Sequence, residues 1–148
     1  MLTYGTEIQT TSDGKTVLLE DLMIGQMVFN PFSKECDEII DILTRTLCLN
    51  KSSEVLRPIR LDTYSLSPGR PCRPLLVSRK QEIMCCTTLE INERRRNVAV
   101  VEASSLPGCK VSDALEVTYS AIFFAWPRMI LANGALCATF TNEVFQTS

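Results

Sequence analysis

The side chains best suited to chemistry are seven cysteines, because the sequence contains no histidine. Histidine is the commonest general base, proton shuttle and metal ligand, so its absence removes many enzyme classes. The cysteine count is odd and no pair has C-x-x-C spacing, which argues against a zinc site or a complete disulfide framework. We therefore expect no metal and no cofactor, and reduced thiols of which several are buried as small apolar side chains. The seven are Cys36, Cys48, Cys72, Cys85, Cys86, Cys109 and Cys137.

A cysteine enzyme is the weakest of the functional hypotheses. Cys72 and Cys85 are its candidate nucleophiles, but no histidine is present to lower a thiol pKa. Cys85 and Cys86 are neighbours in a strand-like run, so alternation would point one side chain inward and the other outward. Simple packing is the favoured interpretation of that pair.

The other residues of interest lie in a polar step, Ser78 to Gln81, between two short apolar runs. Pro68 and Gly69 before it are typical of a turn. Leu75–Val77 and Ile83–Met84 have the apolar character of buried strands. The sequence thus predicts a turn, a strand, a polar step and a second strand.

The rest of the chain repeats this pattern of short strands and turns, which predicts an all-β domain. Asp13-Gly14 and Asn133-Gly134 predict tight hairpins. Residues 36–48 favour strand, with helix as the alternative. Pro58 predicts an edge strand or a bulge in the run 56–61. We expect one domain over residues 1–148, with a tail at 142–148.

Bulk properties point to no nucleic acid or membrane partner. The 148 residues carry a formal net charge of −2 and 45% hydrophobic side chains, values ordinary for one globular domain. Three successive arginines, at 94–96, are interpreted as a solvated turn, since no aromatic residues interleave with them. No apolar run has the length of a membrane span, and the polar start predicts no secretory signal.

Four segments, in this order, resemble the Hint domain family, which includes inteins and the processing domain of Hedgehog proteins. The likeness is strongest to the bacterial and phage-borne Hedgehog/intein group. The matching segments are Met1-Leu2-Thr3-Tyr4-Gly5-Thr6-Glu7-Ile8, residues 17–28, the segment from 56–60 through 75–78, and Ile130-Leu131-Ala132-Asn133-Gly134. The resemblance implies a single-domain horseshoe of bent β-hairpins in two pseudo-symmetric halves.

The resemblance also implies where catalytic groups should stand. A Hint enzyme uses a thiol or hydroxyl at its first residue to attack the preceding carbonyl, and that position is Met1. Its Thr/Ser-x-x-His step is Ser78 followed by Gln81, and glutamine does not shuttle protons at neutral pH. Pro74 replaces an aspartate, and residues 125–128 replace a charged segment. A start at Met1 would also leave no upstream peptide to cut.

The resulting hypothesis is a non-catalytic Hint fold that serves as a structural or protein-binding module. By analogy with phage carriers of the group, we expect a virion or phage-tail component, located in the cytoplasm or virion, with other protein subunits or a second copy as partners. Phe123, Phe124 and Trp126 are candidate interface residues, although core packing is the favoured interpretation of such aromatics. The alternative is a self-cleaving Hint domain whose first nucleophile has been replaced.

Overall fold

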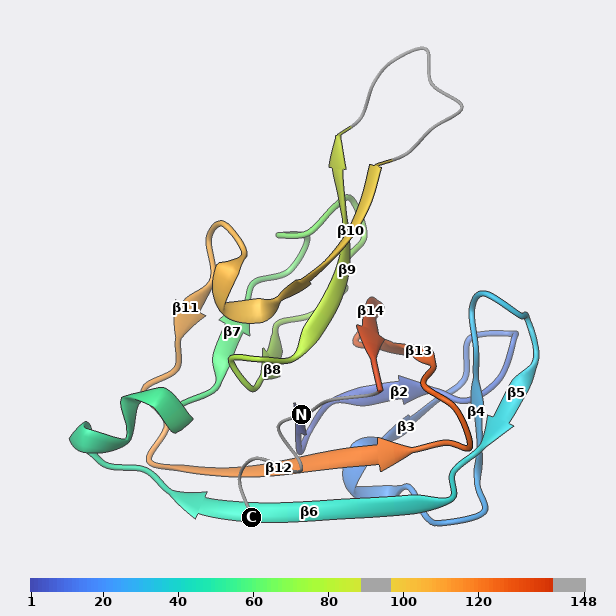
Figure 1. Ribbon diagram of the computed structural model, residues 1–148, viewed down its shortest axis with the longest axis horizontal. Coiled ribbons are helices and arrows are strands. Elements are labelled where there is room, and N and C mark those ends of the chain that lie inside the picture. The colour runs from blue at the N-terminus through green and yellow to red at the C-terminus, as the bar shows by residue number, and fades with distance from the viewer. Residues whose placement is uncertain (89–96, 140–148) are drawn as a thin grey trace.

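The computed structural model describes residues 1–88 and 97–139, and over these residues the chain is an all-β single domain with short 3-10 turns (Figure 1). The predicted fold class is therefore confirmed. Strands are β1 (Leu2–Thr3), β2 (Glu7–Gln9), β3 (Thr16–Leu18), β4 (Met27–Phe29), β5 (Cys36–Glu38), β6 (Asp41–Cys48), β7 (Ile59–Leu61), β8 (Leu75–Val77), β9 (Glu82–Thr88), β10 (Asn97–Glu102), β11 (Lys110–Val111), β12 (Glu116–Phe123), β13 (Met129–Ala132) and β14 (Ala135–Ala138). The 3-10 helices are η1 (Leu19–Asp21), η2 (Lys51–Leu56) and η3 (Ala103–Ser105).

Two six-stranded antiparallel sheets make up most of the domain. One has the order β11-β7-β8-β1-β12-β6 and the other β10-β9-β14-β13-β2-β3, while β4 and β5 form a separate pair. The chain passes directly from the first sheet to the second after β1, β8 and β12. Figure 1 shows long β12 and β6 side by side below, with the β9–β10 ribbon rising from the opposite part of the molecule. The passage after β8 carries the polar step Ser78 to Gln81.

The two predicted hairpins form where the turn sequences stand. Asp13-Gly14 lies in the connection 10–15 between β2 and β3, and Asn133-Gly134 alone joins β13 to β14. Both Asn133 and Gly134 have positive φ, 47° and 79°, which is the backbone conformation that this turn type requires. A Cβ at Gly134 would lie 3.3 Å from the Cys72 sulfur, so the close approach adds a second reason for glycine.

Asn133 also fastens three segments together. Its side chain accepts a hydrogen bond from Glu7 N at 2.8 Å and donates one to the Pro74 carbonyl at 3.0 Å. Its backbone carbonyl accepts from Cys72 N at 2.8 Å. This buried clasp holds β2 and the segment before β8 against the β13–β14 turn.

The apolar core has two clusters. The larger draws on all three sheets, through residues such as Leu2, Ile8 and Val28. The smaller lies on the first sheet and consists of Met1, Leu49, Val117, Tyr119 and Ala121. Met1 is thus a core residue as well as a candidate site residue.

One sequence prediction about local structure was wrong and another was met in part. Pro58 precedes β7, which lies between β11 and β8 and is not an edge strand. The proline needs no bulge because it stands before the first residue of the strand, where its carbonyl accepts a hydrogen bond from Ser112 N at 2.9 Å and its missing N–H breaks no bond within β7. The expectation that several cysteines are buried is met in part. Among cysteines whose side chains are described, Cys137 is buried, Cys85 and Cys109 are half-buried against the core, and Cys36, Cys48 and Cys72 are exposed.

The remaining local predictions divide into confirmed and untested ones. Residues 36–48 form strands β5 and β6, as favoured over helix. The arginine turn at 94–96 and the tail at 142–148 lie outside the described residues. Cys85 is half-buried, and the side chain of its neighbour Cys86 also lies outside them.

Candidate functional site

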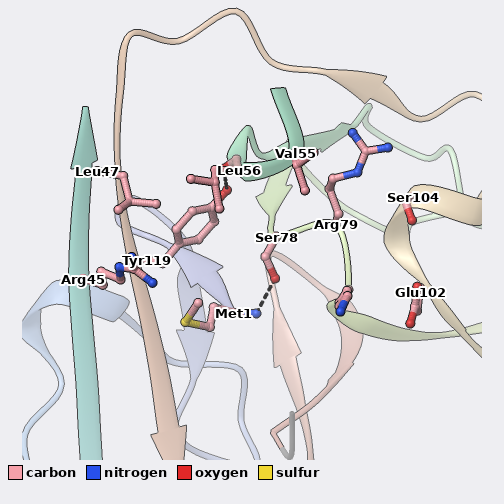
Figure 2. Close-up of a pocket in the computed structure, with 11 residues that line it drawn as sticks. Met1, Arg45, Leu47, Val55, Leu56, Ser78, Arg79, Glu102, Ser104 and Tyr119 are labelled. Carbon is pink, nitrogen blue, oxygen red and sulfur yellow. Dashed lines mark hydrogen bonds between the residues drawn. The ribbon is translucent and has the colours of Figure 1, made fainter. Parts of the chain in front are cut away.

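The structure brings Met1 against Ser78, although 77 positions separate them in the chain. The Met1 backbone nitrogen donates a hydrogen bond to Ser78 Oγ at 2.6 Å, drawn as a dashed line in Figure 2. The Met1 carbonyl accepts from Ser78 N at 2.9 Å. Both residues are buried, so two hydrogen bonds fix the first residue at the end of β8.

A tight turn from Ser78 to Gln81 orders the polar step. Gln81 N donates to the Ser78 carbonyl at 3.1 Å. Two further backbone bonds tie the turn to η3, with Ala103 N donating to Gln81 O and Ser104 N to Arg79 O. The three-residue spacing therefore places Ser78 and Gln81 at the two ends of one turn. Their side chains contact different parts of the molecule, Met1 in the case of Ser78 and Ala138 in the case of Gln81.

The Gln81 amide is fully engaged with backbone. Its Nε2 donates to the Glu82 carbonyl at 2.9 Å and to the Ala138 carbonyl at 2.8 Å. A primary amide has two N–H donors, so both are used. Gln81 is 2% exposed, and the void beside it, bounded by Met1 and Thr139 among others, has a volume of only about 10 Å³. This side of the turn is filled.

The other side of the turn opens into a cleft of about 370 Å³. One wall is apolar and the facing wall is polar, and Met1 and Ser78 lie at the base between them (Figure 2). The apolar wall consists of Leu47, Leu56 and Tyr119, with Arg45 beside Tyr119 and Val55 at the rim near Arg79. The polar wall consists of Arg79, Glu102 and Ser104, and Lys80 also lines the cleft. A concave space of this size is within the usual range for a ligand site.

The cleft carries positive charge in a chain that is slightly acidic overall. Arg45, Arg79 and Lys80 line it with Glu102 as the one acidic side chain among its described lining residues. The Tyr119 hydroxyl donates to the Leu56 carbonyl at 2.8 Å, which fastens η2 to β12. The cleft is therefore a built concavity with a fixed apolar wall and a cationic one.

Cys137 lies in the buried side of the site and is not a reactive thiol. Burial raises its pKa to about 12, and the Met1 amino group opposes this rise only in part. A thiol with that pKa stays protonated at neutral pH and is a weak nucleophile. Within residues 1–88 and 97–139, no three cysteine, aspartate or glutamate side chains group to hold a metal ion.

The aromatic candidates for an interface separate into two kinds. Phe124 is buried in the main core and Phe123 is half-buried against the smaller cluster. Trp126 is 69% exposed, so core packing does not account for it. Segment 125–128 has a structural role through Arg128, whose Nε donates to Asp37 at 3.0 Å and joins β5 to the start of β13.

Sequence reasoning identified Met1, Ser78 and Gln81 but missed most of the cleft. Arg45 and Leu47 lie on one face of β6, two positions apart, and Tyr119 comes from β12 opposite them. The alternation of these strands was readable, but which face would meet the Ser78 turn was not. Val55 and Leu56 belong to a 3-10 helix, in a stretch that no sequence pattern assigned to the site.

The fold and the placement of the first residue define a protein built like an intein splicing domain. The chain is 12% identical to the Msm DnaB1 intein splicing domain bound with zinc, with a TM-score of 0.56 over 95% of this chain and 100% of that one. A gp41-1 intein is also 12% identical, with a TM-score of 0.51 over 92% and 96% of the two chains. A bacterial intein-like domain from Clostridium thermocellum is 16% identical, with a TM-score of 0.51 and the same coverages.

The family described as Hint domain matches residues 1–144, so this chain belongs to the Hint domain family. The resemblance drawn from the four sequence segments is therefore confirmed. No curated protein matches the chain. Within the described residues, no helix is long and apolar enough to cross a membrane.

Proposed function

We propose that this Hint domain is a non-catalytic module that binds protein, as part of a larger assembly. The observation that carries the proposal is the state of Gln81. Where a Hint enzyme would need a proton-shuttling histidine, both N–H groups of Gln81 are already bound to backbone carbonyls. The side chain has no donor left for a substrate carbonyl, so its role is to join β9 to β14.

The first residue supports the same proposal. The thioether of Met1 cannot form the thioester or ester that starts autoprocessing. Its side chain instead belongs to the small core cluster with Leu49 and Tyr119. The groups that would perform the chemistry are thus replaced by groups that pack and hydrogen-bond, while the scaffold and the open cleft remain.

An autoprocessing assay tests the non-catalytic half of the proposal. The full chain is placed behind a short leader peptide, once with Met1 unchanged and once with Met1→Cys, and cleavage by an added thiol is followed over time. We expect both leaders to stay attached, because Gln81 cannot act as the acid or base. Appreciable cleavage of the Met1→Cys form would instead support the alternative, a self-cleaving domain with a replaced nucleophile.

Gln81→His, added to the leader-bearing Met1→Cys protein, is the matched comparison. Histidine restores a group that can transfer protons. Faster cleavage of the protein with both changes than of the Met1→Cys protein would assign the missing proton transfer to position 81. The protein-binding half is tested separately, by the native mass of the full chain and by the proteins that copurify with it. A chain that is monomeric and has no copurifying protein would contradict that half.

A further inference from the structure

We propose that the cleft beside Ser78 binds an extended segment of a partner protein in which apolar and acidic side chains alternate. This inference rests on the proposed protein-binding function and names the kind of partner that the site would take. It concerns the open side of the Ser78–Gln81 turn, where the lining residues come from the turn itself and from β6, η2, β10, β12 and η3.

The apolar wall is a rigid surface with uncovered area. Tyr119 is buried and its hydroxyl is fixed to Leu56, so the wall keeps its shape without a ligand. Val55 is 77% exposed and Leu56 40% exposed, at the rim of that wall. Exposed apolar side chains that line a concavity are the usual contact surface for an apolar side chain of a partner.

The facing wall supplies the charge that decides the partner's sign. Arg79 is half-buried, and its side chain makes no hydrogen bond or ion pair with any residue that the structure describes. The Arg79 carbonyl accepts a hydrogen bond from Ser104 N at 3.1 Å, so the backbone from which the guanidinium side chain extends is fixed. A carboxylate is the group complementary to the Arg79 guanidinium, and Arg45 and Lys80 add two further cationic side chains to the lining.

Two unlike walls that face one another match the geometry of an extended chain. Successive side chains of a strand point to opposite sides, so alternating residues would reach the apolar wall and the cationic wall in turn. A helix would instead present its apolar stripe to one wall and keep most of its acidic side chains away from the other. The cleft thus favours a partner segment in which apolar and acidic side chains alternate along the chain, and not merely one that contains both.

The experiment uses the full chain and three short, blocked peptides carrying a fluorescent label. One alternates leucine and glutamate, one alternates leucine and lysine, and one alternates glutamine and glutamate. We expect the leucine–glutamate peptide to bind most tightly by anisotropy, with weaker binding as salt rises. Equal binding of all three peptides, or no binding of the leucine–glutamate peptide, would overturn the proposal. Octanoate, a small molecule with one apolar chain and one carboxylate, is a further comparison, and an affinity equal to that of the leucine–glutamate peptide would also overturn it.

Charge and apolar variants of the cleft locate the binding site. Arg79→Glu should weaken the leucine–glutamate peptide about tenfold or more. Arg70→Glu is the matched control, since it makes the same charge change on an exposed arginine outside the cleft. Val55→Gln should weaken binding, whereas Val111→Gln, an exposed valine on β11, should not. Circular dichroism confirms that each variant is folded, and equal losses in variants and controls would overturn the assignment.

Failure of this inference can be told from failure of the proposed function. If the leader-bearing chain stays intact and copurifies with a partner while the peptide does not bind, the cleft assignment alone is wrong. If the chain cleaves its own leader, the non-catalytic proposal is wrong whatever the peptide does.

Discussion

The two sides of the Ser78–Gln81 turn differ in how completely they are filled. On the Gln81 side, one buried amide bonds two carbonyls and leaves a void of about 10 Å³. On the Ser78 side, about 370 Å³ stands open between an apolar and a cationic wall. Met1 borders both spaces. A single short turn therefore separates a closely packed region from an open concavity.

Because of this contrast, the two sides should respond differently to the same kind of change. Substitution on the filled side removes hydrogen bonds that no water can replace, so it should lower stability. On the open side, substitution of a wall residue that already faces solvent should alter binding and leave stability nearly unchanged. The buried base of the cleft, which includes Ser78, should respond as the filled side does. Paired variants on the two sides distinguish these responses.

Gln81→Leu should have the largest effect on stability. It leaves the Glu82 and Ala138 carbonyls without this donor in a buried site, and we expect the free energy of unfolding to fall by about 2–4 kcal/mol. Urea unfolding followed by circular dichroism measures it. Gln9→Leu is the matched control, since Gln9 is half-buried and makes one local bond to Thr11, and it should cost about 1 kcal/mol or less. Equal losses would refute the contrast.

Ser78→Ala should have the next largest effect. It removes the acceptor of the 2.6 Å bond from the Met1 nitrogen, and we expect a loss of about 1–2 kcal/mol by the same measurement. Ser104→Ala on the polar wall of the cleft is the comparison, and it should change stability by no more than about 0.5 kcal/mol. Ser78 is buried at the base of the cleft and Ser104 is a half-buried residue of its wall, so a larger loss for Ser104→Ala than for Ser78→Ala would contradict this distinction between base and wall.

Ionisation of Cys137 should lower the stability of the folded chain at alkaline pH. Burial raises its folded pKa from 9.0 to about 12, so the protonated thiol favours the folded state. This contribution is complete below about pH 9 and is lost as the pH rises toward 12, because the unfolded thiol ionises first. Near pH 10 the loss should be about 1 kcal/mol. Cys137→Ala should lose stability less steeply than the natural chain between pH 9 and pH 10, and parallel profiles would contradict this account.

Sequence reasoning predicted the parts of the fold that depend on local backbone chemistry. Asp13-Gly14 and Asn133-Gly134 specify hairpin turns through the conformations that those residues allow. It did not predict the side-chain clasp of Asn133 on Glu7 and Pro74, since those bonds depend on how β2 and the chain before β8 meet the turn. It also did not tell which cysteines are buried, because exposure of a small apolar residue depends on which surface the core covers.

The order of residue types along the chain was enough to specify the all-β class, the hairpins, the methionine at the first position and the three-residue spacing of Ser78 and Gln81. Folding in three dimensions was needed to bring the Gln81 amide to the Ala138 carbonyl, 57 positions away, and to set Arg79 across a cleft from Tyr119. Turn chemistry acts between neighbours in the chain. Which carbonyl an amide reaches, and which wall an arginine faces, depend on the register and packing of sheets whose strands are far apart in sequence.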